Sequence, residues 1–129
     1  MPVRSSNSSV LRWPDARAVD RAVREWAAAR AREREDVVRI GYAGSYARGD
    51  WGPGSDVDLI VIVEESDRPF EERGRGWGTL DLPVPADLLV YTREEWRRLK
   101  ESASRFVREA EQDGAWVWPP ARSHRETKP

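Results

Sequence analysis

The sequence predicts a single α+β domain in which a small mixed β-sheet is layered with helices. Three observations support this fold class. The chain has 129 residues, enough to build one hydrophobic core. Short apolar runs, typical of buried strands, occur at residues 37–43, 57–63 and 86–91. Apolar residues recur at helical spacing before the first of these runs and after the last.

A helix is predicted at the start of the domain, over about residues 14–34. Pro14 suits the first turn of a helix, and Asp15 suits its positive end. Behind them, apolar residues share one face while arginines and glutamates occupy the other. We expect residues 1–12, which precede the helix, to be a flexible segment.

Two strands are expected to follow this helix. The first, 37–43, ends at Gly44, and residues 46–49 are expected to form a short helical turn. The second strand, 57–63, is apolar on both faces, which predicts a central position in the sheet. Residues 64–83 match no pattern that indicates a particular element.

A third strand and a helix are expected next. Residues 86–91 form the predicted strand, and Thr92 followed by Glu95 is a capping box. One continuous helix is expected behind the box, with Gly114 as its C-terminal stop. The apolar stripe of this helix consists of Trp96, Leu99, Ala103, Phe106 and Ala110.

A short final strand is expected at residues 115–118. Trp116 and Trp118 are two residues apart, so we expect them to project from one face of that strand. They either pack on the domain's own sheet or form an exposed apolar anchor for a partner. The predicted domain therefore covers residues 13–120, and the polar tail 121–129 is expected to be disordered.

Composition limits the chemistry that is available. The chain has no cysteine, which excludes disulfides and thiolate metal sites, and its only histidine, His124, lies in the polar tail. Carboxylates remain as metal ligands, and they suit magnesium or manganese. The formal net charge of −1 gives no overall positive field that would attract nucleic acid. No apolar run is long enough to span a membrane, and we expect a cytoplasmic protein.

Two aspartates stand at the start of the second predicted strand. Asp56 and Asp58 are two residues apart, so their side chains point to the same face. Neighbouring carboxylates repel each other, and a bound cation relieves that repulsion. Asp87 begins the next strand and can join them if the two strands are neighbours. Three such carboxylates can bind two divalent ions, which hold the attacking and leaving oxygens of a phosphoryl transfer.

Gly44 and Ser45 directly follow the first strand and are candidates for binding phosphate. Glycine lets the backbone approach a phosphate closely, and Ser45 offers a hydroxyl and an amide N–H. The alternative is a tight-turn glycine followed by a serine N-cap. Arg48 either neutralises triphosphate charge or forms a structural salt bridge. Ser55 is a further candidate at the nucleotide site, or it orients the Asp56 carboxylate.

The aromatic residues have alternative roles as well. Trp51 and Trp77 lie in glycine-rich loops, where packing within the loop is the expectation and stacking on a base is the alternative. Trp96 and Phe106 are expected to belong to the core. The arginine–glycine stretch at residues 73–78 is only a weak indication of nucleic-acid binding.

Residues 44–59, GSYARGDWGPGSDVDL, resemble the minimal nucleotidyltransferase pattern G-S-x-A-R-G-x5-S-D-x-D-L at every fixed position. That family belongs to the DNA polymerase beta superfamily. The resemblance implies its fold, magnesium-dependent nucleotidyl transfer and catalytic roles for Asp56 and Asp58. It also implies a third aspartate on a later strand, which Asp87 matches. The resemblance covers roughly residues 37–118.

The resulting hypothesis is an enzyme that moves a nucleotide, AMP from ATP or another NTP, to a hydroxyl acceptor. Asp56 and Asp58 would hold two Mg²⁺ ions, or Mn²⁺, together with Asp87, which would also help to deprotonate the acceptor. Small members of the family often pair with a HEPN-domain toxin and adenylylate it as antitoxins, which implies a protein partner; a homo-oligomer is the alternative. The alternatives are a catalytically silent module of the same fold that binds a nucleotide or a partner, and an RNA-modifying subunit, which the net charge disfavours.

Overall fold

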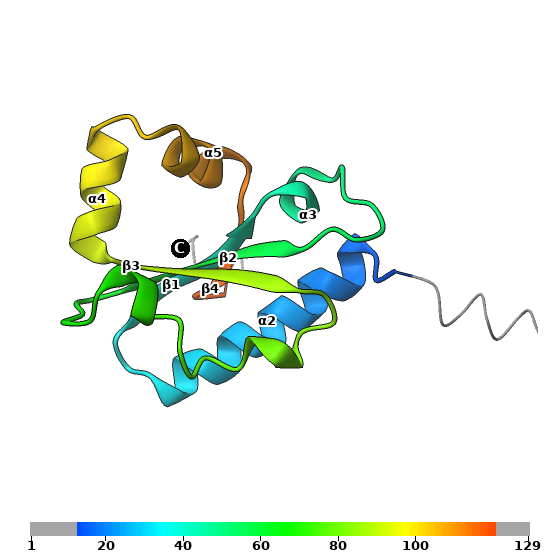
Figure 1. Ribbon diagram of the computed structural model, residues 1–129, viewed down its shortest axis with the longest axis horizontal. Coiled ribbons are helices and arrows are strands. Elements are labelled where there is room, and N and C mark those ends of the chain that lie inside the picture. The colour runs from blue at the N-terminus through cyan, green and yellow to red at the C-terminus, as the bar shows by residue number, and fades with distance from the viewer. Residues whose placement is uncertain (1–12, 121–129) are drawn as a thin grey trace, which may run out of the picture.

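The computed structural model describes residues 13–120, so the expectations for residues 1–12 and 121–129 concern segments outside this range (Figure 1). The α+β fold class predicted from the sequence, a small mixed sheet flanked by helices, is confirmed. The elements in chain order are α2 (Ala16–Glu33), β1 (Val37–Ala43), α3 (Ser45–Arg48), β2 (Val57–Val63), the 3-10 turns η1 (Phe70–Glu72) and η2 (Thr79–Asp81), β3 (Ala86–Thr92), α4 (Arg93–Glu101), α5 (Arg105–Asp113) and β4 (Ala115–Trp118).

The four strands form one sheet in the order β3-β2-β1-β4. β1 is antiparallel to both β2 and β4, whereas β2 and β3 run parallel. β2 is therefore central, as its apolar character predicts. In register, Ala43 lies opposite Asp58, and Asp58 lies opposite Asp87. The C-terminal end of β1 thus meets the N-terminal ends of β2 and β3 at one end of the sheet.

Helices cover both faces of the sheet, and the side-chain alternation of β2 divides the core between them (Figure 1). Leu59 and Val61 pack in the cluster that contains the apolar face of α2. Ile60 and Ile62 pack in the other cluster, with residues of α4 and α5. Asp58 belongs to the same alternating row as Ile60 and Ile62, so its side chain lies on the α4–α5 face of the sheet.

Polar contacts fix α2 against the sheet. Asp15 caps the helix, and its carboxylate accepts a hydrogen bond of 2.9 Å from the Ala18 N–H, as expected for a helix start. The Tyr42 hydroxyl of β1 donates to Asp20 Oδ1 at 2.7 Å. Trp26 Nε1 donates to the carbonyl oxygen of Trp77 at 3.0 Å, which ties the loop before β3 to α2.

The two loop tryptophans pack within the domain, as expected. Trp77 is only 2% exposed, and the Arg34 guanidinium lies 3.9 Å above its ring. Trp51 stacks on Tyr46 with a centroid separation of 5.4 Å and an interplanar angle of 9°. These contacts hold the two rings in place and leave no reason to assign either of them to base stacking.

The expectation of one continuous helix after the capping box was wrong. The box itself is present, with Thr92 as N-cap and Glu95 at its third position. The helix ends at Glu101, and Ala103 has a φ of +62°, a left-handed conformation that no α-helix contains. Ser104 then caps a second helix by accepting a hydrogen bond from the Val107 N–H.

The expected common face for the two C-terminal tryptophans was also wrong. Trp116 packs with the α4–α5 cluster, whereas Trp118 packs with the α2 cluster. The pairing of β1 with β4 is irregular between Ile40 and Gly41, which breaks the simple alternation along β4. Both rings are half-buried against the domain's own sheet, the first of the two roles considered for them.

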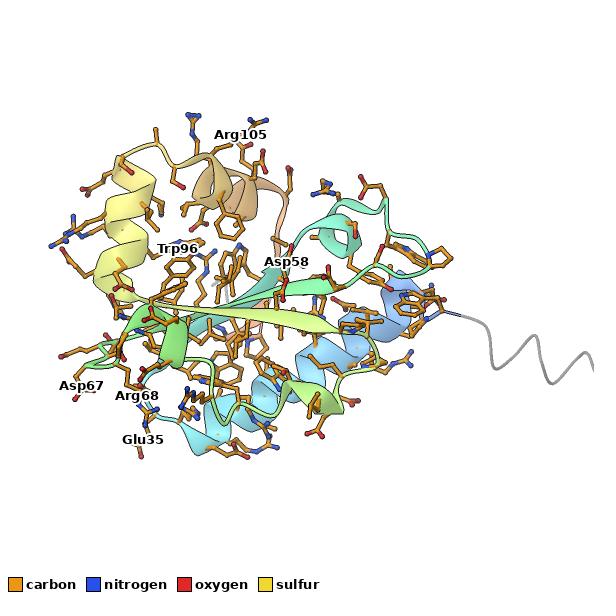
Figure 2. The ribbon with its side chains drawn as sticks, viewed as in Figure 1. Glu35, Asp58, Asp67, Arg68, Trp96 and Arg105 are labelled. Atoms are coloured by element: carbon orange, nitrogen blue, oxygen red, sulfur yellow. The ribbon has the colours of Figure 1, made fainter. Side chains whose placement is uncertain are left out.

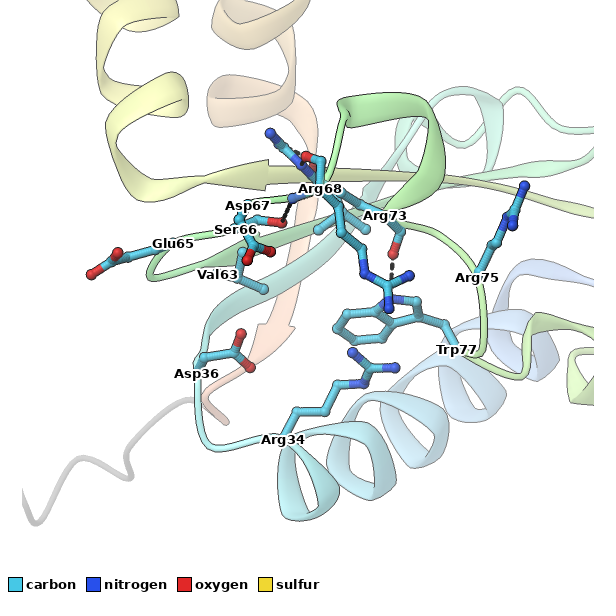
Figure 3. Close-up of a pocket in the computed structure, with 11 residues that line it drawn as sticks. Arg34, Asp36, Val63, Glu65, Ser66, Asp67, Arg68, Arg73, Arg75 and Trp77 are labelled. Carbon is cyan, nitrogen blue, oxygen red and sulfur yellow. Dashed lines mark hydrogen bonds between the residues drawn. The ribbon is translucent and has the colours of Figure 1, made fainter.

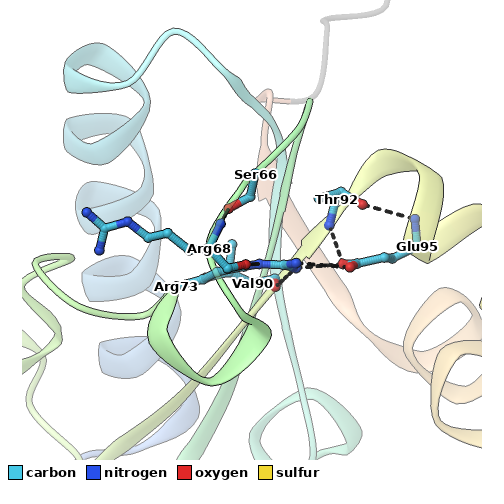
Figure 4. A network of polar contacts seen from close by, with 6 residues as sticks. All are labelled: Ser66, Arg68, Arg73, Val90, Thr92 and Glu95. Atoms are coloured by element: carbon cyan, nitrogen blue, oxygen red, sulfur yellow. Dashed lines mark hydrogen bonds and ion pairs between the residues drawn. The ribbon is translucent and has the colours of Figure 1, made fainter.

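A polar network joins the loop before β3 to the start of α4 (Figure 4). The Arg73 side chain is 9% exposed and binds both carboxylate oxygens of Glu95, at 2.6 and 3.0 Å. It also donates to the carbonyl oxygens of Arg68 and Val90. Glu95 in turn accepts from the Thr92 N–H of the capping box. Arg73 therefore connects the loop, β3 and α4 through one guanidinium group.

We expect Arg73→Met to lower the free energy of unfolding by about 2–3 kcal/mol, because it leaves carbonyl oxygens and a carboxylate without their donor. Arg93→Met is the matched control, since Arg93 pairs with Glu64 at the surface with 60% and 53% of the side chains exposed. Such an exposed pair contributes less than about 1 kcal/mol. Urea denaturation measures both; equal effects would contradict the role given to Arg73.

Candidate active site

The three predicted aspartates gather at the sheet end where β1, β2 and β3 meet. Asp58 and Asp87 are register partners on adjacent parallel strands, and Asp56 lies just before β2. Asp58 is half-buried, whereas Asp56 and Asp87 are exposed. Figure 2 shows Asp58 at the end of β2, below the space between α5 and α3. The prediction that Asp87 joins the other aspartates required its strand to be a neighbour of β2, and the pairing of β2 with β3 meets that condition.

Asp58 has an unfavourable electrostatic environment. Burial raises the pKa of its carboxyl group, and the negative charges of Asp56 and Asp87 raise that pKa further. The positive charge of Arg48 acts in the opposite direction but does not outweigh them. A divalent cation would relieve this repulsion, so the charge distribution fits a cation site.

The carboxylates do not form a finished metal site by themselves. Within residues 13–120, no three His, Cys, Asp or Glu side chains are grouped closely enough to hold a metal ion. Asp56 and Asp87 are exposed and can change rotamer at little cost. The ligand set Asp56, Asp58 and Asp87 therefore stays a prediction.

Two features require a glycine at position 44: the positive φ of the backbone and the closeness of the Asp58 carboxylate. Gly44 is the N-cap of α3, with φ of +89°, so the alternative in which Ser45 is the N-cap is not what the structure shows. A Cβ atom on Gly44 would lie 2.6 Å from Asp58 Oδ2. The glycine thus brings the turn after β1 close against the carboxylate, and Ser45 begins the short helix.

The other candidates lie in α3 and the loop behind it. Arg48 Nε binds Asp50 Oδ2 at 3.3 Å, but both side chains are more than half exposed, so this ion pair is weak. Ser55 Oγ accepts a hydrogen bond of 2.9 Å from the Gly52 N–H and closes the loop before β2. In this structure Ser55 therefore shapes the loop that presents Asp56.

A cavity of about 390 Å³ opens beside Asp58, within the range of roughly 300–1,000 Å³ typical of ligand pockets. It contains three of the predicted site residues, Gly44, Arg48 and Asp58. Its opposite wall is α5, a contribution that the sequence interpretation missed. The lining consists of Ala43, Gly44, Arg48, Asp58, Phe106, Glu109, Ala110, Asp113 and Gly114.

Phe106 and Asp113 are the main additions to the predicted site. Phe106 was expected to belong to the core; it does pack against the α4–α5 cluster, but it is only half-buried and also lines the cavity. Asp113 was not considered. Positions 106, 109, 110 and 113 share one face of a helix, and this spacing can be read from the sequence. It indicates a site residue only once α5 is known to lie beside Asp58.

A second cavity, of about 250 Å³, lies at the opposite end of the sheet (Figure 3). It contains none of the predicted site residues. Both arginines and acidic residues line it, and Arg73 is already engaged with Glu95. We therefore place the candidate active site at Asp58. The second cavity is lined by Arg34, Asp36, Val63, Glu65, Ser66, Asp67, Arg68, Arg73, Arg75, Trp77 and Val90.

Comparison with known proteins identifies the family of the chain. Residues 24–114 of the 129 match the family model described as a nucleotidyltransferase domain. The chain belongs to this nucleotidyltransferase family. Its fold is similar to the crystal structure of a "putative nucleotidyltransferase" from Sulfolobus solfataricus, with a TM-score of 0.58, 18% sequence identity, and coverage of 80% of this chain and 82% of that one. No curated protein sequence matches the chain.

The resemblance to the minimal nucleotidyltransferase pattern is thus confirmed, and nucleotidyl transfer is the enzymatic activity of the family. The family match includes β1, β2 and β3, which carry the glycine turn and the aspartates. Among the helices of residues 13–120, none has both the length and the apolar character needed to cross a membrane.

We expect Gly44→Ala to disturb the candidate site more than Gly49→Ala, a second substitution at a positive φ. Gly44 (φ +89°, ψ −159°) adopts a conformation that essentially only glycine takes, and Gly49 (φ +93°, ψ 4°) is left-handed, so alanine is strained at both positions and more so at Gly44. Only at Gly44 would the Cβ also collide with Asp58; at Gly49 nothing lies within 4 Å. Urea denaturation and nucleotide binding of both variants make the comparison. Equal loss of binding would contradict a specific Gly44–Asp58 contact.

We expect Asp58→Asn to preserve or raise the free energy of unfolding near neutral pH. A raised pKa in the folded state means that the carboxyl group favours folding when protonated and loses that contribution as pH rises through its pKa. The asparagine variant should lack this pH dependence. Asp67→Asn, at the far end of the sheet in Figure 2, is the control for net charge. Thermal unfolding between about pH 4 and about pH 8 measures this dependence; a strong destabilisation would indicate a structural role instead.

Proposed function

We propose that this domain transfers AMP from ATP to a hydroxyl group of an acceptor, with Mg²⁺ as its cofactor. The observation that carries the proposal is the meeting of Asp58, Asp87 and Gly44 at one end of the sheet, beside a cavity of ligand size. Hard carboxylate oxygens of this kind suit Mg²⁺ or Mn²⁺. Family membership supports the reaction class, and the choice of ATP and AMP is part of the proposal.

Asp56, Asp58 and Asp87 would hold two Mg²⁺ ions. When bound, the ions supply charge neutralisation at the phosphates and at the attacking and leaving oxygens. The raised pKa of Asp58 supports this assignment, because two neighbouring carboxylates already oppose its ionisation and a cation would favour it. The exposed side chains of Asp56 and Asp87 can reorient to complete the ligand set.

The turn after β1 would hold the triphosphate. Gly44 gives its backbone close access to the space beside Asp58, and Ser45 supplies an N–H and a hydroxyl at the start of α3. Arg48 lines the same cavity, and its weak, exposed pair with Asp50 leaves the guanidinium free to bind phosphate. Ser55 would act from the loop before β2, by positioning Asp56 or by reaching the nucleotide.

In the reaction, the acceptor oxygen attacks the α-phosphorus of ATP and forms a new P–O bond, while the bond to the β-phosphate bridging oxygen breaks and pyrophosphate leaves. The acceptor proton passes to a carboxylate, for which we propose Asp87. Asp87 suits this role because it lies on the edge strand β3 and is exposed, so that an acceptor can reach it.

The acceptor is proposed to be a protein, namely a HEPN-domain toxin that the domain would inactivate by adenylylation. Asp87 is exposed at the start of the edge strand β3, where a large partner can approach it. A protein acceptor also brings its own binding surface, which supplies the positioning that this transfer needs. Self-association is the second arrangement, in which one copy would present the acceptor to another.

A transfer assay with ATP labelled at the α-phosphate tests the function. The protein is incubated with Mg²⁺ and the purified product of the neighbouring gene, and label on that protein is expected. Asp58→Asn and Asp87→Asn should lower labelling by at least about 100-fold, the usual scale for removing an essential catalytic group. Asp36→Asn, an exposed aspartate outside the site, is the control.

Calorimetry with ATP separates the alternatives. Binding should require Mg²⁺ and disappear with EDTA, because the triphosphate and carboxylates share the ion. ATP binding of equal strength without metal would contradict the metal assignment. Metal-dependent binding without transfer to the partner, to a second copy or to RNA would favour the catalytically silent module of the same fold.

A further inference from the structure

The side-chain row of β2 places α5 beside the reacting centre. Asp58, Ile60 and Ile62 lie on one face of β2, and α4 and α5 cover the two isoleucines. Asp58 lies at the start of this row, beyond the two covered isoleucines. The cavity of about 390 Å³ opens beside it, between the glycine turn and α5. Any substrate held at Asp58 on this face therefore lies against α5.

The lining of the cavity indicates which part of the substrate this is. Gly44 and Arg48, the proposed phosphate contacts, line it on one side, and α5 lines it on the other. Asp87 does not line it; this exposed residue lies on the edge strand β3. A nucleotide held by its phosphates at Gly44 and Arg48 thus extends its nucleoside toward α5, while the acceptor approaches from the side of Asp87.

The face of α5 that lines the cavity suits a nucleoside. Phe106, Ala110 and Asp113 are spaced by four and three residues, so they share that face. Ala110 and Gly114 are small and leave space, whereas the Phe106 ring is half-buried and borders the cavity with an aromatic surface. Aromatic rings of this kind stack on bases of any sequence.

Asp113 does not stabilise the helix that carries it. It is the last residue of α5, at the negative end of the helix dipole, where an acidic side chain is unfavourable, and no basic residue accompanies it in the last turn. Within residues 13–120 it forms no ion pair, whereas Glu109 on the same face pairs with Arg105 at 3.2 Å. Its carboxylate is therefore available as an acceptor for N–H groups in the cavity.

We propose that α5 forms the nucleoside pocket, in which Phe106 packs against the base and Asp113 accepts a hydrogen bond from an amino group of that base. This assignment rests on the proposed function. It makes the ligand class an NTP with an amino-bearing base, such as ATP, and it makes Phe106 and Asp113 the residues that determine the preference for the base. Uracil and hypoxanthine lack the exocyclic amino group that Asp113 would bind and offer only a ring N–H as donor.

Calorimetry of the full chain with Mg²⁺ and three probes tests the assignment: ATP, inorganic tripolyphosphate, and purine riboside triphosphate, which lacks the amino group of adenine. Tripolyphosphate reports on the phosphate and metal contacts alone. The wild type should bind ATP at least about fiftyfold more tightly than tripolyphosphate, from about fivefold for the stacked base and about tenfold for its amino group. ATP should also bind about tenfold more tightly than purine riboside triphosphate.

The variants are Phe106→Ala, Phe106→Leu and Asp113→Ala, with Gln112→Ala on the exposed side of α5 as control. Both Phe106 variants should reduce the ATP advantage over tripolyphosphate by at least about fivefold, while tripolyphosphate affinity stays unchanged and reports that the site is folded. The leucine variant keeps the apolar packing of Phe106, so it serves if the alanine variant does not fold. Asp113→Ala should remove the preference for ATP over purine riboside triphosphate.

Each outcome decides the matter. Equal affinity of the wild type for ATP and tripolyphosphate, or an ATP advantage that both Phe106 variants leave undiminished, would overturn the nucleoside pocket and leave the proposed function standing. An unchanged preference for the amino-bearing base in Asp113→Ala would overturn the role of that residue. If neither ATP nor tripolyphosphate binds to the wild type, the proposed function fails, and this assignment fails with it.

Discussion

The register between β2 and its two neighbours is the constraint on which the rest of the site depends. It sets Ala43 opposite Asp58 on one side and Asp87 opposite Asp58 on the other. A shift of one residue in either pairing would turn the affected side chains to the opposite face of the sheet. The buried alternation of Leu59 and Ile60 prevents that shift, because each faces a different apolar cluster. The hydrophobic core therefore fixes the positions of the carboxylates.

The same arrangement has an electrostatic cost. Asp58 is half-buried between two other carboxylates, and Gly44 leaves it no room to move toward the turn after β1. Apolar packing on both faces of β2 offsets this cost and holds the strand in place despite the repulsion. Local instability of this kind is common where a protein prepares a site for a ligand that will neutralise it.

The sequence was sufficient for features that depend on local pattern and insufficient for those that depend on packing. Alternating or continuous apolar runs gave the four strands, and the aspartates at their starts could be related to one sheet end. The apolar stripe continues through Ala103, so periodicity alone could not reveal that the chain breaks there; Ser104, a good N-cap, was the available signal. Phe106 looked like a core residue because its second environment, the cavity beside Asp58, exists only after α5 folds onto the sheet.

β4, the last strand, pairs with the edge of β1 that β2 does not cover. β4 pairs with β1 through Ala115, Trp116 and Trp118, about seventy residues further along the chain, a long-range contact that forms slowly. Until that contact forms, β1 is an edge strand with unpaired backbone groups and an apolar neighbourhood, the usual starting point for strand-to-strand aggregation. Solubility of the nascent domain therefore depends on the arrival of four residues that take no part in its chemistry.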